Sequence, residues 1–460
     1  MFVVSLVGTS YKGNINVEFL NNLVGNNSII FSAVILLLAY VFIAMEKIPK
    51  VTIALIGAAI TMFLGLVSIN KTLPNGELDP HYYVNFIDFN VIFLLVSMMI
   101  IVNISTETGV FNWIANQLLK FTKGHPVKVL VVLALFTAVA SAFLDNVTTV
   151  ILIMPVTFYI ADKLGINPIP YLITEILSSN IGGTATLIGD PPNIIIGSAA
   201  GFSFMDFLLE LTNIVVLILL TVIFVMYLFF RKHLKTTPEK MAEIANLDNS
   251  HTIKDKNGMI RSVCVLGLVI LGFVTHDITH IPASLSAMAG ASFLLLFENP
   301  KHIIKDVEWN TIFFFIGLFI IIGGLEASGG IALMAKWLLA ITKGSEAATA
   351  MVILWGSGIL SGIIDNIPYT VTMAPMIANI QSVMGAEYAH PLWWCLSLGA
   401  CLGGNLTIIG AAANVIVSET AASKKHPISF MSFLGYGSIT VFISLVMSTI
   451  YIYFRFLINT

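Results

Sequence analysis

Residues 141–155 read SAFLDNVTTVILIMP, and residues 361–375 read SGIIDNIPYTVTMAP. A second pair of stretches repeats in the same way: residues 179–197 read SNIGGTATLIGDPPNIIIG, and residues 403–414 read GGNLTIIGAAAN. Each stretch recurs 220 or 221 residues further along the chain. The chain therefore contains an internal repeat, and the best-matched parts of the two copies are polar turns within apolar surroundings.

The composition is that of a membrane protein. The chain has 460 residues, of which 57% are hydrophobic and 10% are charged, whereas a soluble domain carries roughly 25% charged residues. Apolar runs of about 20 residues recur along the length, and each can cross a hydrocarbon core of roughly 30 Å as a helix. The sequence thus predicts an all-α polytopic membrane protein. It contains no basic block for nucleic acid and no nucleotide-binding or protease motif, so we expect no enzyme activity and no nucleic-acid partner.

The first half of the chain predicts five crossings and one hairpin. Crossings are expected at 28–45, 51–69, 90–104, 171–200 and 213–230, with an interfacial helix at 110–123. Residues 126–164 are interrupted by Asp145 and Asn146. The arm after that turn, 148–161, is 14 residues or about 21 Å long as a helix, too short to span, so we predict a re-entrant hairpin with Asp145 at its tip. Glycines and prolines break the 171–200 crossing in its middle.

The second half retraces this plan. We predict an extracytoplasmic tail at 1–27, a first repeat at 28–230, a cytoplasmic connector at 231–259 and a second repeat at 260–460. Five crossings per repeat is an odd number, so the two repeats should be inverted relative to each other. Most of the 22 lysine and arginine residues then fall on the side predicted to be cytoplasmic, which places the N-terminus outside.

The repeated turns are the candidate ion site. Broken helices survive at membrane depth only where protein or a water-filled cavity receives their backbone polar groups, and in transporters they mark binding sites. Hydroxyl and amide oxygens suit a hard cation such as sodium. An acid inside the membrane that can hold either a proton or a metal cation is the minimum for an antiporter.

Two acids carry this hypothesis, Asp145 and Asp365, and each also has a simpler interpretation. An aspartate before a helix often only caps it. Its duplication at membrane depth favours a functional part. Asp190 precedes Pro191 and Pro192 and is either a turn residue or part of the site; the second repeat has Ala411 at that position.

The motifs SAFLDNVTT and SSNIGGTATLIGDPPNIII resemble the ArsB/NhaD branch of the ion transporter superfamily, which includes arsenite pumps, sodium–proton antiporters and P-protein-like permeases. The resemblance covers nearly the whole chain. It implies an elevator-type, homodimeric secondary transporter with its ions held between the hairpin tips and the broken helices. The related sodium–dicarboxylate carriers have neutral tips, and the acids here make a carboxylate substrate less attractive.

The candidate ion-binding residues, combining the repeated turns with this resemblance, are Ser141, Asp145, Asn146, Thr148, Asn180, Gly182, Gly183, Thr184, Thr186, Gly189, Asp190, Asn193, Ser361, Asp365, Asn366, Gly403, Gly404, Asn405, Thr407, Gly410 and Asn414. Within this set, Asp145, Asn146, Asp365 and Asn366 are the candidate sodium ligands. No cofactor is expected; the coupling ion is H⁺ or Na⁺.

The function we expect is proton- or sodium-coupled antiport, in the efflux direction, of a small ion such as sodium or arsenite across the plasma or inner membrane. Cation-coupled uptake of a small inorganic or carboxylate anion is the alternative, and a passive channel is less favoured. The expected partners are the ion, the lipid bilayer and a second copy of the chain. An arsenite pump would also work with a separate ATPase subunit, for which the sequence contains no evidence.

Overall fold

The computed structural model describes residues 27–45, 47–67, 71–72, 78–79, 82–245 and 253–458. The predicted N-terminal tail, apart from Asn27, lies outside the described residues. Within the described residues the chain is all-helical apart from one two-stranded ribbon, in which β1 (Lys71–Thr72) pairs antiparallel with β2 (Leu78–Asp79). Eight of these helices are long and apolar enough to cross a membrane. The fold class predicted from composition is confirmed.

The helices of the first half follow the predicted order. They are α2 (Ser28–Ala44), α3 (Lys50–Phe63), the short η1 (Tyr82–Phe86), α4 (Phe89–Glu107), α5 (Val110–Thr122), α6 (Pro126–Phe143), α7 (Asn146–Leu164), α8 (Ile169–Gly183), α9 (Pro191–Ala200) and α10 (Phe204–Phe230). The connector contains one helix, α11 (Pro238–Ala245).

The second half repeats that order. Its helices are α12 (Lys256–Val274), α13 (His276–Thr279), α14 (Ala283–Leu295), α15 (Pro300–Lys305), α16 (Trp309–Ala327), α17 (Gly330–Ile341), α18 (Glu346–Ile364), α19 (Asn366–Met384), α20 (Ala386–Gly403), η2 (Ile408–Gly410), α21 (Ala412–Ser423), α22 (Phe430–Ile452) and η3 (Tyr453–Leu457).

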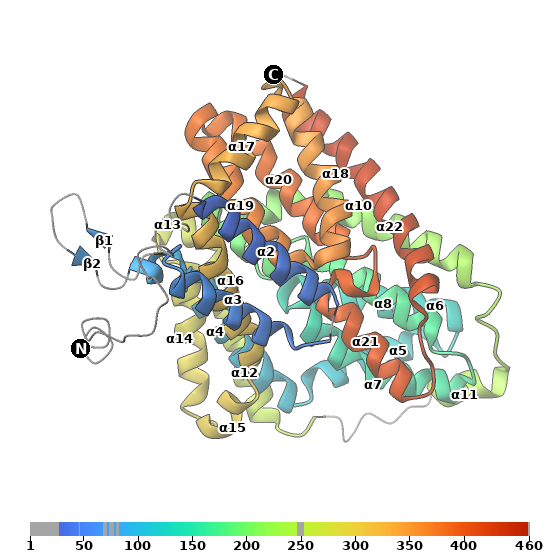
Figure 1. The fold of residues 1–460 in the computed structure, drawn as a ribbon. Coiled ribbons are helices and arrows are strands. Elements are labelled where there is room, and N and C mark those ends of the chain that lie inside the picture. Colours follow the sequence, from blue (N-terminus) through green and yellow to red (C-terminus); the bar gives the residue numbers. More distant parts are fainter. Residues whose placement is uncertain are drawn as a thin grey trace.

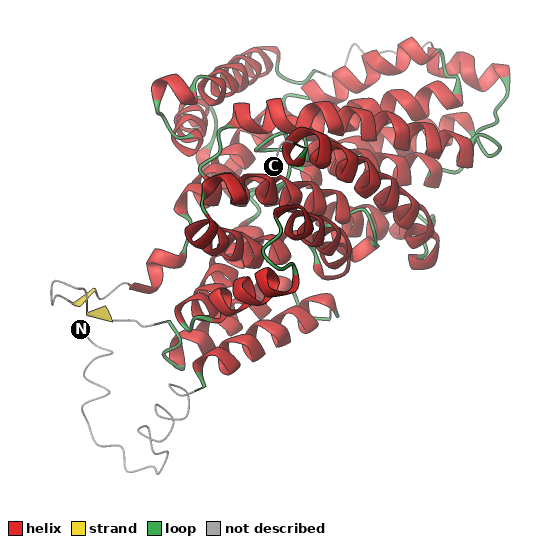
Figure 2. Cartoon of the chain, turned by 90° about the horizontal axis from the view of Figure 1, so that it is seen from above, coloured by secondary structure: helices red, strands yellow, loops and turns green. Residues whose placement is uncertain are grey.

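Helices from the two halves interleave (Figure 1), and Figure 2 shows that the fold they form is almost entirely helical. Helix α3 packs along α16 and α14 packs along α4, so each of these pairs joins one half to the other. The hairpin helices instead pack on the broken helix of their own half, α6 on α8 and α18 on α20. One group, containing α2, α3, α4, α12, α14 and α16, therefore lies beside a second group built from the hairpins and the broken helices.

Close helix packing explains two of the repeated glycines. An added Cβ on Gly403 of α20 would lie 2.6 Å from the carbonyl oxygen of Gly358 in α18. In the first half, Gly182 of α8 faces the backbone of Ala138 in α6 in the same way. Both hairpins thus approach their broken helices through a glycine contact that a side chain would block.

Several predicted boundaries differ from the structure. The second arm of the first hairpin is 19 residues long rather than 14, because the Asp145 cap starts the helix at Asn146 and the helix continues through Pro155 as far as Gly165. It meets the length criterion for a crossing, so the argument from a short arm was wrong. Helix α10 starts at Phe204 rather than at residue 213, since Ser203 and Asp206 form a capping box there.

Candidate functional site

The candidate site lies where the two hairpin turns meet the two helix breaks. The first turn separates α6 from α7 and the second separates α18 from α19. The breaks run from 184 to 190 and from 404 to 411. A proline at the first position of α9 starts that helix anew after the first break.

Asp190 is the acid on which both hairpin turns converge. Its side chain is completely buried. The amide nitrogen of Asn146, from the first turn, donates to Asp190 Oδ1 at 3.3 Å. The amide nitrogen of Asn366, from the second turn, lies 3.2 Å from both carboxylate oxygens. Within the part of the chain that the structure describes, Asp190 has no ion-pair partner.

A second set of amide contacts joins the two halves beside Asp190. The Asn180 amide nitrogen donates to Asn405 Oδ1 and to Asn414 Oδ1, each at 2.9 Å. Asn180 Oδ1 accepts from Asn146 at 3.2 Å. These side chains are all buried, and such hydrogen bonds satisfy polar groups that would otherwise be costly inside the protein.

Asn180 of the first half contacts the break of the second half, and the equivalent contact from the second half to the first break is made by residues of other types. Cys401 stands where the repeat alignment has Asn180, and its thiol lies 3.4 Å from Asn193 Oδ1. Ser397 donates to the same oxygen at 2.6 Å. Cys401 also contacts Asp190. Sequence reasoning did not place Cys401 or Ser397 at the site, although aligning the two copies would have set Cys401 opposite Asn180.

Both breaks are held by the same hydrogen bonds. Asn193 donates to the carbonyl of Thr186 at 2.9 Å, and Asn414 donates to the carbonyl of Thr407 at 2.9 Å. The hydroxyl of Thr407 donates to the carbonyl of Gly362 in the second hairpin at 2.6 Å. Thr186 donates to Ala142 of the first hairpin in the same way. The two asparagines therefore hold the shape of each break, and the two threonines fix each hairpin to its own break.

The two tip acids differ although each is followed by asparagine. Asp145 has φ −71° and caps α7 by accepting from the backbone nitrogen of Thr148 at 2.8 Å. Asp365 has φ 106°, a region that favours glycine, and accepts from the nitrogen of Ile367 at 3.1 Å. Pro368 aligns with Thr148 and has no N–H, so the cap used by Asp145 is not available to Asp365.

The surroundings of the tips also differ in charge. Lys50, at the start of α3, forms an ion pair with Asp365, whose side chain is 2% exposed. Beside it, the Tyr40 hydroxyl of α2 contacts Thr372 and the carbonyl of Pro368. On the other side, Glu308 precedes α16, and its burial together with the nearby Asp145 carboxylate raises the pKa of Glu308. Sequence reasoning missed these three partners, since nothing local marks them.

The structure thus brings the predicted residues into one region, where some contact one another and others hydrogen-bond to the backbone. The members that contact one another across the site are Asn146, Asn180, Asp190, Asn366, Asn405 and Asn414, while Asn193 contacts Ser397 and Cys401 of the second half. The members that donate to backbone carbonyls are Thr184, Thr186, Ser361 and Thr407, and the Ser141 hydroxyl accepts from the Ser179 hydroxyl at 3.2 Å. Glycines 183, 189, 404 and 410 lie where the two ends of each break meet, since an added Cβ on Gly183 would lie 2.6 Å from the Gly189 oxygen.

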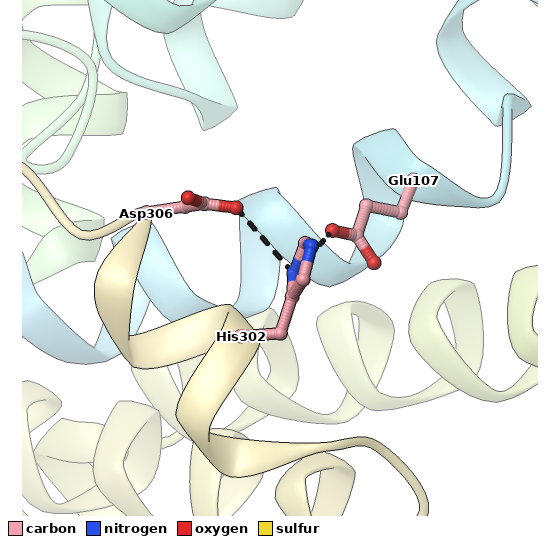
Figure 3. A group of neighbouring side chains, drawn as sticks. All are labelled: Glu107, His302 and Asp306. Atoms are coloured by element: carbon pink, nitrogen blue, oxygen red, sulfur yellow. Dashed lines mark ion pairs between the residues drawn. The ribbon is translucent and has the colours of Figure 1, made fainter.

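A separate ionisable cluster lies on the surface (Figure 3). His302 Nδ1 lies 3.2 Å from Glu107 Oε1 and 3.5 Å from Asp306 Oδ2. All three side chains are exposed. Glu107 ends α4 in the first half and the other two belong to the second half, so this cluster joins the halves at the surface and has no contact with Asp190.

Comparison with known proteins agrees with this architecture. The model of the citrate transporter family (CitMHS) matches residues 40–399. The chain belongs to the citrate transporter family. It is 40% identical over 432 residues to an uncharacterized transporter of Mycobacterium bovis, covering 93% of this chain and 99% of that protein. It is 31% identical to the P protein of Sus scrofa, covering 88% of this chain and 57% of the P protein.

The fold is also that of a solved transporter. The chain superposes on the YdaH transporter of Alcanivorax borkumensis with a TM-score of 0.52 and 13% identity, covering 91% of this chain and 97% of that one. This family member is thus a multi-pass membrane protein and a secondary transporter, not an enzyme, and the resemblance inferred from its motifs is confirmed.

Proposed function

We propose that this transporter exchanges a small ion for protons or sodium, and that Asp190 is the acid that binds the coupling cation. The observation that carries the proposal is the convergence of Asn146 and Asn366, one from each hairpin tip, on a buried carboxylate that has no ion-pair partner among the described residues. An unpaired buried carboxylate is costly. Binding a proton or a cation removes that cost, so the site favours occupation by either one.

The oxygen-rich surroundings of Asp190 support sodium as one of the two cations that bind there. Carboxylate and amide oxygens are the ligands that hard cations prefer. The amide oxygens of Asn146 and Asn366 accept no hydrogen bond from the described residues, and a half-turn of either amide group would bring its oxygen towards Asp190. Protons and sodium would then compete for one carboxylate, which is the exchange step of an antiporter.

The remaining features of the proposal concern orientation and movement. We place the protein in the plasma or inner membrane as a homodimer, with the N-terminus outside and the two repeats inverted. The group containing the hairpins and broken helices moves past the group containing α3 and α16, as in an elevator. Efflux of sodium or arsenite remains the favoured direction and cargo.

Uptake of a carboxylate anion is the second candidate, favoured by the match to the citrate transporter family model. A multivalent anion needs positive partners. Among the described residues, the basic side chain at the hairpin tips is Lys50, and its charge is already paired with Asp365. That pairing makes this candidate the weaker one.

The test is a flux assay in proteoliposomes with a defined pH gradient and a panel of sodium, lithium, arsenite and citrate. The wild-type protein is expected to move sodium or arsenite uphill, and Asp190→Asn to lose this coupled flux while remaining folded in detergent. Glu419→Gln, which removes an exposed acid on α21, is the matched control and should keep it. Wild-type flux in Asp190→Asn would refute the proposal, and sodium-dependent citrate uptake would establish the second candidate.

A further inference from the structure

A basic pocket lies at one end of the second helix group, between the ends of α7 and α21. Its volume is about 560 Å³. Phe158, Asp162 and Gly165 line it from the end of α7, and Lys424, Lys425 and His426 line it from the loop after α21. Helix α11 of the connector packs against α7.

The pocket carries excess positive charge. The Lys424 ammonium lies 4.9 Å from the centre of the Phe158 ring, and the His426 ring lies 6.5 Å from the same ring. The Lys240 ammonium of α11 lies against Gly165 at the pocket wall. Asp162 is the acid of the lining. Within the described parts of the chain, neither Lys424 nor Lys425 forms an ion pair.

Lys425 occupies a backbone position that suits glycine. Its φ is 66°, and the loop is closed by a bond from the His426 nitrogen to the Ala421 carbonyl at 2.8 Å. In the first half, the corresponding loop after α9 is closed by a hydrogen bond from the Phe202 nitrogen to the Gly197 carbonyl at 3.0 Å. The residue with positive φ in that loop is Gly201. Folding alone would favour glycine at both places, and the second half has a lysine there.

Exposed apolar side chains adjoin the lining residues along the chain. Tyr159 of α7 follows Phe158 and is 45% exposed, and Met431 at the start of α22 comes five residues after His426 and is 75% exposed. In a membrane protein such side chains face acyl chains, whereas basic residues next to them meet lipid headgroups. The asymmetry of basic residues in the sequence assigns Lys424, Lys425 and Lys240 to the cytoplasmic side, where anionic lipids attract basic clusters.

We propose that this pocket binds the phosphate of an anionic phospholipid headgroup, held by Lys424, Lys425 and His426, with its acyl chains along Tyr159 and Met431. The site is independent of Asp190 and of the transported ion. A soluble phosphate-bearing anion would use the same charges but would gain nothing from the adjoining apolar surface.

The experiment measures binding of dioctanoyl-phosphatidylglycerol to the purified full-length protein in detergent, by native mass spectrometry and by thermal unfolding. Dioctanoyl-phosphatidylcholine and inorganic phosphate are the comparison ligands. The test variant is Lys424→Gln/Lys425→Gly, in which the glycine suits the local backbone and keeps the fold. The control variant is Lys301→Gln/Lys305→Gln, which removes two exposed lysines of α15.

The expected result is that phosphatidylglycerol binds the wild-type protein and the α15 control equally, and binds the test variant about tenfold or more weakly, because two charges near the membrane surface are lost. Unchanged binding in the test variant, or equal loss in the control, would overturn the site. Equal binding of phosphatidylcholine, or equal stabilisation by inorganic phosphate, would overturn its assignment to an anionic lipid. Melting of the unliganded test variant at the wild-type temperature verifies that folding is not the cause.

Discussion

Pro368 determines how the second hairpin tip is built. The two tips share the pair Asp-Asn, but the residue two positions later is Thr148 in one and Pro368 in the other. Pro368 has no N–H that Asp365 could cap, as Asp145 caps that of Thr148. Asp365 instead adopts φ 106° and forms an ion pair with Lys50. The two Asp-Asn tips therefore have different electrostatic surroundings. Asp365 is neutralised by Lys50, whereas Asp145 lies near the acidic Glu308.

The Lys50–Asp365 ion pair should show coupling in a double-mutant cycle. Removing either partner leaves a charge in a largely buried place. Because Lys50 is 27% exposed, we expect Lys50→Met or Asp365→Asn to lower the free energy of unfolding by about 1–3 kcal/mol, less than for a fully buried pair. The double variant should lose clearly less than the sum. Additive losses, measured by unfolding in detergent, would show that the pair contributes nothing.

At Asp145, two substitutions separate capping from ion binding. Asparagine caps helices about as well as aspartate, whereas alanine costs roughly 1 kcal/mol. Asp145→Asn should therefore keep the wild-type unfolding temperature, and Asp145→Ala should lower it. If Asp145 also attracts the coupling ion, both variants should weaken its apparent affinity in proteoliposomes. If Asp145→Asn keeps the wild-type affinity for the coupling ion, Asp145 acts only as a helix cap.

At the scale of elements, the repeated glycines set the spacing between hairpin and broken helix. Gly403 meets the backbone of Gly358, and Gly182 meets that of Ala138. Backbone cannot move aside as a flexible side chain can, so a methyl group there must separate the helices. These glycines support the site by packing, and the structure shows no need for them to contact the ion.

Gly403→Ala should therefore destabilise the protein by about 1–3 kcal/mol, the usual range for overpacking. The control is Gly267→Ala in α12, where an added Cβ meets nothing within 4 Å. That change should be neutral or slightly stabilising, because alanine is the better helix former. Unfolding temperatures in detergent compare the two, and equal effects would argue against the close-packing explanation.

At the scale of the whole molecule, polar contacts between the two helix groups are concentrated at one place. Tyr40 of α2 and Lys50 of α3 both reach α19 or its tip. If the groups slide past each other during transport, these contacts must break in every cycle. In that case they would hold the state seen in the structure and would be absent from the opposite one.

A cross-link across this boundary should stop transport. With Cys264 replaced by serine, Tyr40→Cys and Thr372→Cys joined by a short bismaleimide are expected to abolish flux, because the reagent ties one group to the other. The control pair is Asn103→Cys and Asp306→Cys, where the Asn103 amide lies 3.0 Å from the Asp306 oxygen and both belong to the same group. Full flux in the cross-linked first pair would rule out the sliding motion.

Local chemistry made the turns and breaks predictable. Aspartate followed by a helix, paired glycines and Pro191 act on their immediate neighbours, so their effects can be read from sequence. The length of α7 was misjudged because an apolar run does not show where a capped helix begins. The Lys50–Asp365 and Tyr40–Thr372 contacts join residues 315 and 332 positions apart, and no pattern in one sequence marks such pairs. Asp190 remained undecided for the same reason, since only folding brings Asn146 and Asn366 to it.

The replacement of Asp190 by Ala411 in the second repeat has an electrical consequence. With Asp365 offset by Lys50, Asp190 carries one negative charge when its site is empty and is neutral when a proton or a sodium ion is bound. An exchanger that crosses only when loaded would then move no net charge on Asp190, whereas an empty crossing would carry that charge through the field, at about 2.3 kcal/mol per 100 mV for a full crossing. Membrane voltage would therefore act on empty crossings and leave the loaded exchange at Asp190 unaffected.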